Sequence, residues 1–289
     1  MSLNATLDRP YTTLLVDADI VAFKFASSNQ ESHEWGNGVK TVTVTPLEEV
    51  AAEVDVWLAN LKETLKADEL IICLSCSHEE NFRLGVLPSY KGNRDYDNRP
   101  VLLGAIKDHM ADNYRTYARP SLEADDVMGI LSTHPTLIPG RKIIVSEDKD
   151  MKTIPGWLYN PAKDFKPRLI AEQDAEYFHL YQTLTGDATD HYKGCPGVGP
   201  VAAEECLSMV EKLVPVHREI TQGKRKGEIE TKFEKVPADS LWEAVVSRYH
   251  AKGLTEEDAL VQARCARILR HIDYCFKTKQ VIPWTPLMK

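Results

Sequence analysis

The stretch Thr12-Thr-Leu-Leu-Val-Asp-Ala-Asp19 decides the fold class, because a short apolar run ends abruptly in two carboxylates. Such a run is typical of a strand buried on both faces, and the acids then fall in the turn that follows it. Further runs of this kind cover residues 70–74 and 142–145, and residues 114–117 form a weaker one. The sequence therefore predicts several buried strands, some of which end in acidic turns.

Helical patterns separate these strands. A helix is expected to begin at Thr45-Pro46, since a capping residue precedes proline and two glutamates follow in the first turn. The apolar face of this helix is formed by Leu47, Val50, Val54, Trp57, Leu58, Leu61 and Leu65. Residues 127–131 lie in another helical pattern. This alternation predicts an α/β fold whose central, mainly parallel sheet is flanked by helices.

The character of the chain changes twice. Between about residues 83 and 105, charged residues, Gly, Pro and Tyr replace the apolar pattern, so we expect a long loop or arch above the sheet. Beyond about residue 181 no convincing strand pattern remains, and this part is expected to be helical. We thus predict an N-terminal α/β domain over residues 1–182 and a C-terminal helical region over residues 183–289.

The composition is that of a globular protein, with 289 residues, 43% hydrophobic and 27% charged. No apolar run approaches the length of a membrane span, and residues 1–10 lack the basic start and apolar stretch of a signal peptide. We therefore expect a cytoplasmic protein without membrane contact. No heptad pattern or long apolar edge demands a protein partner.

Six cysteines are spread along the chain, which is not the dense pattern of a secreted disulfide scaffold, so we expect them to be reduced. Cys73-Leu-Ser-Cys76 is compatible with a zinc or redox pair. No second pair completes a zinc site, however, and a buried strand explains the spacing more simply.

A net charge of −8 argues against a protein that coats nucleic acid non-specifically, because such binding requires clustered cations. Two local groups are nevertheless basic. Residues 212–235 hold seven Lys or Arg against four Glu, and the second group is Arg83, Lys91, Arg94 and Arg99. Taken alone, each is typical of a solvated face as well as of a nucleic-acid contact.

Carboxylates gather in four separate groups, at the places where open α/β sheets hold their sites. Two groups follow strands and two open helical segments: Asp17 and Asp19; Asp148 and Asp150; Glu123, Asp125 and Asp126; Asp187 and Asp190. Each group alone is also explained by helix capping or by a turn.

Together these carboxylates would repel one another by several kcal/mol unless cations lay between them. Oxygen ligands without a His or Cys cluster favour Mg²⁺ or Mn²⁺ over Zn²⁺. Two such ions roughly 4 Å apart support hydrolysis of a phosphodiester. The sequence therefore predicts a site for two Mg²⁺ ions, with Mn²⁺ as a substitute.

Two segments fit a nucleic-acid substrate. In Pro88-Ser-Tyr-Lys-Gly-Asn-Arg94, Lys91 and Arg94 are suited to neutralise a phosphate while Tyr90 stacks on a base, although an exposed turn is also possible. Lys193-Gly-Cys-Pro-Gly-Val-Gly199 places Gly197 and Gly199 around Val198 and precedes a helical run. This pattern predicts a helix-hairpin-helix that holds one DNA backbone without reading its sequence, or else a purely structural turn.

These motifs, in this order, resemble the 5′ nucleases, which include the flap endonucleases and the 5′-nuclease domain of bacterial DNA polymerase I. The similarity is closest to the exonucleases of short-tailed bacteriophages. It runs from Leu15-Val-Asp-Ala-Asp19 through Tyr90-Lys-Gly-Asn-Arg94, Glu123-Ala-Asp-Asp126, Ser146-Glu-Asp-Lys-Asp150 and Gly186-Asp-Ala-Thr-Asp190 to the glycine hairpin. Ala266-Arg-Ile-Leu-Arg270 and Tyr274 also resemble the phage branch, so the similarity covers nearly the whole chain.

The resemblance implies the PIN-like 5′-nuclease fold, with a helical arch that carries Lys91 and Arg94 over the active site. It assigns one metal to Asp17, Glu123, Asp125 and Asp126, and a second to Asp148, Asp150, Asp187 and Asp190. Asp17, Asp125 and Asp148, together with Lys91 and Arg94, are the implied catalytic residues. The glycine hairpin, from Lys193 to Gly199, would bind duplex DNA and hold K⁺ with backbone carbonyls.

The implied activity is 5′ to 3′ exonuclease and flap endonuclease cleavage of DNA. Its substrates would be duplexes with 5′ ends, nicks or flaps, and RNA/DNA hybrids such as RNA primers, and its products would be 5′-phosphorylated. The implied setting is phage DNA replication, primer removal, recombination or host DNA degradation, in the cytoplasm of a bacterial host.

One position departs from the family pattern. Family members carry an aspartate just after the second strand, where this chain has Ser75-Cys76-Ser77. A thiol is a poor ligand for Mg²⁺. We expect water or another acid, such as Asp19, to complete this metal position, and one ion to bind more weakly.

Two other functions remain open from the residues alone. Asp17-Ala-Asp-Ile-Val21 also satisfies the motif of haloacid-dehalogenase-like phosphatases, with Asp17 as nucleophile and Asp19 as acid and base. A non-catalytic, structure-specific DNA-binding protein would keep the hairpin and use its acids for folding.

Overall fold

Strand β1 (Thr12–Asp17) lies inside a six-stranded sheet of order β5-β4-β1-β6-β7-β8. All neighbouring pairs are parallel except β7–β8, which confirms the prediction of a mainly parallel sheet. The other strands are β4 (Glu69–Leu74), β5 (Thr116–Ala118), β6 (Arg141–Val145), β7 (Gly156–Tyr159) and β8 (Arg168–Ile170). The computed structural model describes residues 9–36, 39–95 and 98–286, so the interpretation of residues 1–8 lies outside the described residues.

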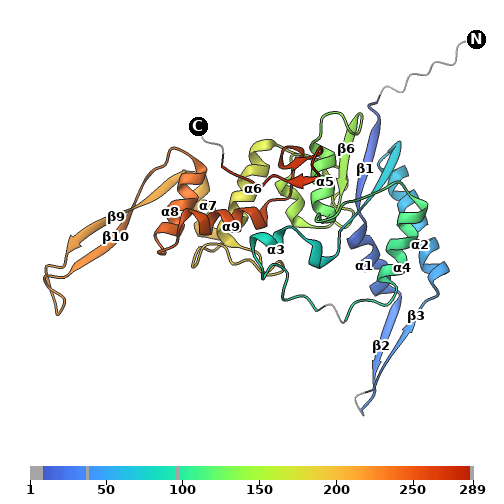
Figure 1. Cartoon of the computed structure of the whole chain (residues 1–289), viewed down its shortest axis with the longest axis horizontal. Coiled ribbons are helices and arrows are strands. Elements are labelled where there is room, and N and C mark those ends of the chain that lie inside the picture. Colours follow the sequence, from blue (N-terminus) through green and yellow to red (C-terminus); the bar gives the residue numbers. More distant parts are fainter. Residues whose placement is uncertain (1–8, 37–38, 96–97, 287–289) are drawn as a thin grey trace, which may run out of the picture. The chain divides into compact units, whose positions relative to one another are not determined.

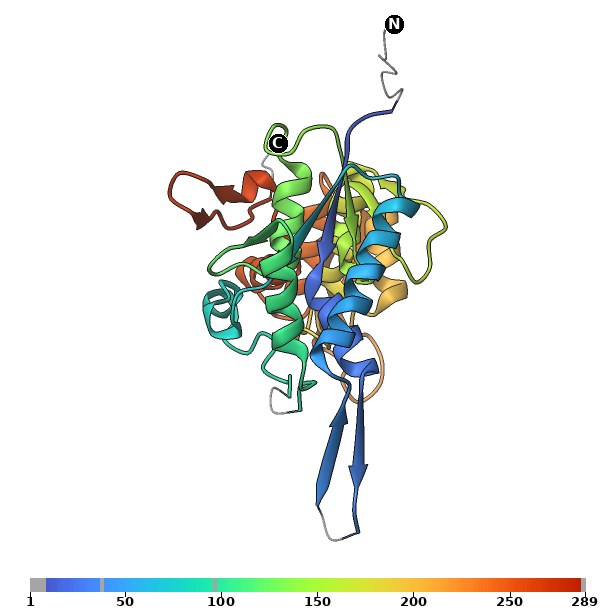
Figure 2. The ribbon, with the colours of Figure 1, turned by 90° about the vertical axis from the view of Figure 1, so that its right-hand side faces the viewer.

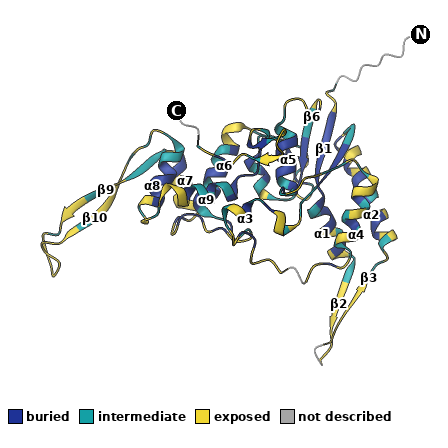
Figure 3. Cartoon of the chain, in the orientation of Figure 1, coloured by how far each residue is buried: buried dark blue, intermediate teal, exposed yellow. Residues whose placement is uncertain are grey.

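Helices cover both faces of this sheet. Successive side chains of a strand point to opposite faces, so an uninterrupted apolar strand needs a covering layer on each side. Leu14 and Val16 of β1 pack in one apolar cluster with helices on the first face, and Leu15 packs in another on the second face. The first cluster includes α1 (Ala18–Ser28), α2 (Leu47–Thr64) and α4 (Leu103–Asn113), and the second includes α5 (Ala124–Thr133). β1 and β6 are accordingly buried throughout much of their length (Figure 3).

The chain divides into two units that are not contiguous in sequence. The first contains residues 1–82, 94–172 and 268–282, and the second contains residues 83–93, 173–267 and 283–289. The predicted division at residues 182 and 183 falls inside α6 (Glu172–Thr185). The segment 268–282, which includes β11 (Tyr274–Cys275) and β12 (Gln280–Val281), packs against α5 and so belongs to the first unit.

The second unit is built around one apolar cluster that joins its helices. These are α6, α7 (Pro200–Met209), α8 (Leu241–His250) and α9 (Glu256–Ala266). The expectation of helices alone beyond residue 181 is wrong, because β9 (Glu211–Glu219) and β10 (Ile229–Pro237) form a long antiparallel ribbon (Figure 1). Both faces of the ribbon are largely exposed, so it lacks the alternation of apolar and polar residues that marks a half-buried strand.

A second exposed hairpin was also not expected. β2 (Gln30–Glu34) and β3 (Lys40–Val44) pair antiparallel and extend away from α1 and α2 (Figure 2). Its residues are mostly exposed, so this hairpin also lacks the alternation of apolar and polar residues that would have predicted it. No helix within the described ranges is both long and apolar enough to cross a membrane.

The segment predicted as a helical arch is helical only at its ends. The four-residue helix α3 (Arg83–Val86) opens it, and α4 begins at Leu103. Between them the described residues form turns and irregular chain, while residues 96–97 lie outside the described part. Pro88, Gly92 and Pro100 explain this departure, since both residue types disfavour a helix interior.

Candidate functional site

Asp17 is the last residue of β1 and the N-cap of α1, and only 3% of it is exposed. Its Oδ1 accepts a hydrogen bond from the Ile20 amide at 3.2 Å, which satisfies a backbone donor at the start of the helix. Its Oδ2 accepts one from the Ser146 hydroxyl at 2.8 Å. Since Ser146 follows β6, this bond joins the ends of two neighbouring strands.

The charge of Asp17 is poorly stabilised by the protein itself. Burial first, then the negative charge of Asp19 and, to a smaller extent, that of Asp148 raise the pKa of Asp17 from its usual 3.8 to about 7, although the hydrogen bonds from Ser146 and Ile20 lower it. A buried carboxylate beside two others favours either a proton or a cation in their midst. The predicted gathering of acids at the ends of β1 and β6 is therefore present.

Asp148 and Asp150 lie in the turn that follows β6. The Asp148 amide donates to the Ser146 hydroxyl at 3.1 Å, and Asp148 Oδ1 accepts from the Asp150 amide at 2.8 Å. Asp148 thereby caps a short 3-10 helix, residues Lys149–Thr153. These bonds fix the backbone that carries both acids, and Asp148 lies close enough to Asp17 to raise its pKa.

Asp19 has a cationic partner that the sequence did not reveal. Its Oδ1 lies 2.6 Å from the Lys107 ammonium of α4, and its Oδ2 accepts from the Ser75 amide at 3.2 Å. Ser75 follows β4, and its hydroxyl accepts from the Ala124 amide at 2.9 Å. Lys107 could not be singled out beforehand, because its pairing depends on how α4 packs against α1.

The acids of the Glu123–Asp126 group lie near two thiols, that of Cys73 in β4 and that of Cys76 just after this strand. Burial first, and then the negative charges of Glu123, Glu80 and Asp126, raise the pKa of Cys76 to about 11. Burial and the charges of Asp17, Asp19 and Asp125 likewise raise the pKa of Cys73. Cys76 therefore stands among carboxylates as a neutral thiol, at the position where the family pattern has an aspartate.

Asp126 is fully buried and holds two backbone segments. Its Oδ2 accepts from the Glu123 amide at 3.2 Å in a capping box at the start of α5, and its Oδ1 accepts from the Leu269 amide at 3.0 Å. Both contacts belong to the folding of the first unit. A ligand role for Asp126 stays a prediction, and it would have to be compatible with these bonds.

Among residues 9–36, 39–95 and 98–286, no group of three or more His, Cys, Asp and Glu side chains is arranged to hold a metal ion. All six cysteines are unpaired thiols, as expected. The ligand roles predicted for the first unit therefore stay predictions; they concern Asp17, Glu123, Asp125, Asp126, Asp148 and Asp150.

In the second unit Tyr90 and Lys91 contact Asp190. The Tyr90 hydroxyl donates to Asp190 Oδ2 at 2.9 Å, the Lys91 ammonium lies 3.4 Å from Asp190 Oδ1, and the Lys91 amide donates to the Asp190 carbonyl at 2.9 Å. Tyr90 is 2% and Lys91 6% exposed. The ring of Tyr90 is thus not open to a base in this arrangement, and its predicted DNA contact stays a prediction.

Asp187 organises the turn that follows α6. Its Oδ1 accepts from the amides of Thr189 and Asp190 at 2.7 and 3.3 Å, and its own backbone pairs with Tyr192. Asp187 is also buried. Stabilisation of this turn is therefore enough to explain Asp187, and the metal roles of Asp187 and Asp190 stay predictions.

The predicted basic surface group near residue 90 is only partly a surface. Arg83 is 2% exposed, and its guanidinium donates to the carbonyls of Cys265 and Arg267 at 3.1 and 2.6 Å. Together with Lys91 it is therefore used inside the second unit, which corrects the expectation of a solvated face. Arg94 and Arg99 are exposed.

The glycine hairpin lies between α6 and α7, as a helix-hairpin-helix requires. Gly197 has φ +72°, a backbone conformation that favours glycine, and Gly199 caps α7 with Pro200 at its first position. Lys193 is exposed beside the turn, while Val198 is buried in the helical core. A Cβ atom at Gly197 would lie 3.5 Å from the ammonium of Lys252, so the turn has a cation that the motif did not reveal.

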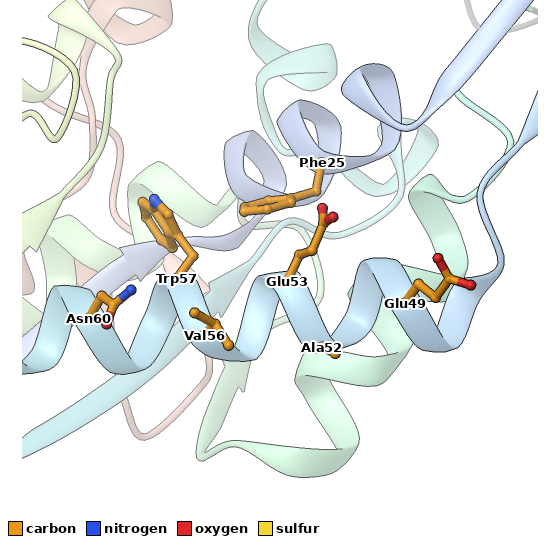
Figure 4. Close-up of a pocket in the computed structure, with 7 residues that line it drawn as sticks. All are labelled: Phe25, Glu49, Ala52, Glu53, Val56, Trp57 and Asn60. Carbon is orange, nitrogen blue, oxygen red and sulfur yellow. The ribbon is translucent and has the colours of Figure 1, made fainter.

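A shallow apolar groove of about 500 Å³ lies on the outer side of α1 and α2 (Figure 4). The apolar side chains of Phe25, Val56 and Trp57 line it, together with the carboxylates of Glu49 and Glu53. It contains neither Asp17 nor the other acids described above, so it is separate from the candidate catalytic residues.

Sequence comparison identifies relatives over as much as 74% of the chain, although no family model matches it. The exonuclease of Escherichia phage T7 is 35% identical over 222 residues, which are 74% of this chain and 74% of that protein. The exodeoxyribonuclease of Enterobacteria phage T3 is 34% identical over 74% of this chain and 73% of its own length. The flap endonuclease Xni of Shewanella piezotolerans is 32% identical over 42% of this chain and 50% of that protein.

Solved structures share the fold. A T5 protein co-crystallised with metal ions matches 88% of this chain and 91% of its own, with a TM-score of 0.56 and 16% identity. The T5 5′-exonuclease with bound zinc ions matches 88% and 93%, with a TM-score of 0.54 and 16% identity. The phage relatives favour the nuclease interpretation over the phosphatase and the non-catalytic protein. The chain therefore belongs to the 5′ nuclease superfamily, close to the phage exonucleases, and it is a nuclease of the hydrolase class.

Proposed function

We propose that the protein hydrolyses DNA phosphodiesters at 5′ ends, nicks and flaps with the help of two divalent metal ions, and leaves 5′-phosphorylated products. The observation that carries this proposal is Asp17, a buried carboxylate whose pKa is raised to about 7 by burial and by its neighbours Asp19 and Asp148. A cation at this sheet edge would relieve the repulsion that otherwise favours a proton. The exonuclease and flap endonuclease relatives support the same activity.

The donor set of the first unit fits Mg²⁺, with Mn²⁺ as a substitute, because its acidic side chains offer hard oxygen atoms. We assign the ligands to Asp17, Glu123, Asp125, Asp148 and Asp150, with Asp126 serving mainly through its backbone contacts. When bound, the metal ions would activate water and stabilise the leaving oxygen. The relatives from T5 were crystallised with metal ions, which supports a divalent metal in this fold.

The protein's own residues then act by position and charge. Ser146 holds Asp17 through its hydroxyl, and the same hydroxyl accepts the Asp148 amide, so both acids are fixed before a metal binds. Lys107 fixes Asp19 and offsets part of the negative charge. Arg94, which is exposed, is proposed to neutralise the phosphate. Lys91, which pairs with Asp190, keeps the role implied by the family resemblance, as do Asp187 and Asp190.

We assign duplex binding to the glycine hairpin of the second unit. The exposed cations Lys193 and Lys252, with the N-terminus of α7 next to Gly199, provide positive charge for one DNA backbone. K⁺ at the hairpin carbonyls and RNA/DNA hybrids as substrates are further parts of the proposal. A role in phage DNA replication is also part of the proposal, and the phage origin of the relatives supports a phage setting.

The direct test is digestion of 5′-labelled duplex, nicked and flapped DNA with Mg²⁺, with Mn²⁺ and with EDTA. We expect cleavage with either metal and none with EDTA. Asp148→Asn should lower the rate on the order of 100-fold or more, because a fixed ligand is lost. Asp112→Asn, which changes the same charge on the exposed end of α4, should leave it unchanged. Intact DNA with both metals would refute the proposal.

A further inference from the structure

The β9–β10 ribbon is long and firmly attached at its base. Nine residue pairs run from Glu211 opposite Pro237 to Glu219 opposite Ile229, which corresponds to roughly 30 Å of strand. At the base, the Leu213 amide donates to the Ser247 hydroxyl at 2.9 Å. The far end therefore lies about one DNA helical turn away from the helices that carry it (Figure 1).

The loop at the far end, residues 220–228, has a closed backbone. The Gly227 amide donates to the Ile220 carbonyl at 2.9 Å, and the Ile220 amide donates to the Glu228 carbonyl at 2.9 Å. The Lys226 amide further donates to the Gly223 carbonyl at 3.3 Å. Lys224 and Lys226 are exposed on this hydrogen-bonded turn, so their charges are presented from a defined backbone. Figure 3 shows the loop at this end of the ribbon in the colour of exposed residues.

Positive charge is concentrated at this tip. Along the strands, cations are matched by acids: Lys212 with Glu243, Arg218 with Glu234, Lys232 with Glu230, and Lys235 with Glu205. At the tip, Arg225 pairs with Glu228 at 2.7 Å. Within the part of the chain that the structure describes, no ion pair is formed by Lys224 or Lys226. Residues 220–228 hold three cations and one acid in a chain of net charge −8.

We propose that this tip, hereafter the ribbon tip, binds phosphates of the substrate duplex at a distance from the helices of the second unit. The inference rests on the proposed function, because it takes duplex DNA as the ligand. The tip lacks aromatic side chains, which disfavours stacking on bases. Lysines on a short turn instead suit phosphate contacts, which give affinity without sequence preference.

The size of the effect follows from counterion release. Each phosphate contact adds about 0.9 to the slope of the logarithm of affinity against the logarithm of salt concentration. If Lys224 and Lys226 each contact one phosphate, replacing both should lower this slope by about 1.8. At 0.1 M salt the corresponding loss of affinity is up to about 60-fold.

The test compares the full-length wild-type protein with K224Q/K226Q and with the control K163Q/K166Q. Lys163 and Lys166 are exposed residues of the first unit, so the control removes the same charge elsewhere. Binding to flapped DNA is measured by fluorescence anisotropy in EDTA over a range of salt concentrations. Duplex arms of 8 and 30 base pairs are compared, because the 8-base-pair arm is shorter than the ribbon and only the longer arm can contact the ribbon tip.

We expect K224Q/K226Q to bind the 30-base-pair arm at least about 10-fold more weakly, with a lower salt slope, and the 8-base-pair arm as wild type does. Equal affinity for the long arm would overturn the inference, and so would an equal loss with the control or with the short arm. Cleavage at saturating DNA should be unchanged in the variant. Failure of the wild-type protein to cleave would instead refute the proposed function.

Discussion

Replacing Asp17 by Asn should stabilise the metal-free protein at neutral and higher pH. The pKa of Asp17 is raised from 3.8 to about 7 by burial and by the charges of Asp19 and Asp148. In the wild-type protein the folded state therefore binds more protons than the unfolded state between these two values. Stability consequently falls as pH rises from about 4 to about 7, and the loss is complete above pH 7.

The size of this loss is set by the separation of the two pKa values. A separation of roughly three units corresponds to about 4 kcal/mol at pH 8, and to less than half of that at pH 5. Asparagine removes the charge and keeps an oxygen that can accept from the Ile20 amide. Allowing half of the effect to be lost by relaxation, we expect a rise of the melting temperature of about 5 °C at pH 8.

The assay is thermal unfolding in EDTA at pH 5 and pH 8, with Asp112→Asn as control. The gain from Asp17→Asn should be larger at pH 8 than at pH 5, while the control changes neither. Mg²⁺ should then raise the melting temperature of the wild-type protein more than that of the variant, because the variant has lost a ligand. A variant that is destabilised at pH 8, or equally affected at both pH values, would show that repulsion around Asp17 is not the cause.

Three further changes test other contacts. Gly129→Ala should destabilise the protein by about 2 kcal/mol or more in urea unfolding, against the usual gain of alanine in a helix, because the new Cβ atom would lie 2.3 Å from the Leu269 carbonyl oxygen; stabilisation would contradict this packing. Cys76→Asp should lower the Mg²⁺ concentration needed for half-maximal cleavage, and an unchanged Mg²⁺ dependence would refute the inferred weak metal position. Lys252→Gln should weaken DNA binding up to about 8-fold at 0.1 M salt without changing the rate at saturating DNA, and equal binding would remove Lys252 from the hairpin contact.

The buried framework could be predicted from the sequence because each of its elements leaves a local pattern. The apolar runs at residues 12–16, 70–74 and 142–145 correspond to β1, β4 and β6. The helix predicted from Thr45-Pro46 is α2, which begins at Leu47. Burial on both faces of a strand, or on one face of a helix, dictates which residue types occur and at what spacing.

The two exposed hairpins could not be predicted in the same way. β2–β3 and β9–β10 face solvent on both sides, so their side chains are selected for neither face. Their pairing is stabilised by backbone hydrogen bonds and by cross-strand pairs such as Arg218 with Glu234. These pairs depend on register, which a search for apolar periodicity does not detect.

Of the candidate site, only the acids that directly follow parallel strands could be placed together from the sequence. Parallel strands end at one edge, so acids that directly follow β1 and β6 had to approach one another. By contrast, the pairing of Lys107 with Asp19 and the bond from the Leu269 amide to Asp126 depend on segments distant in sequence. The burial of Tyr90 against Asp190 likewise required the fold of the second unit.

The distribution of charge also explains how a DNA enzyme can have a net charge of −8. The carboxylates around Asp17 repel a phosphate, so under the proposed function the first unit would favour DNA only after cations had neutralised them. The exposed cations at the glycine hairpin and the ribbon tip belong to the second unit and need no metal. Duplex binding and phosphodiester cleavage should therefore depend differently on metal ions. Removal of the metal should abolish cleavage, while salt-sensitive binding to the duplex persists.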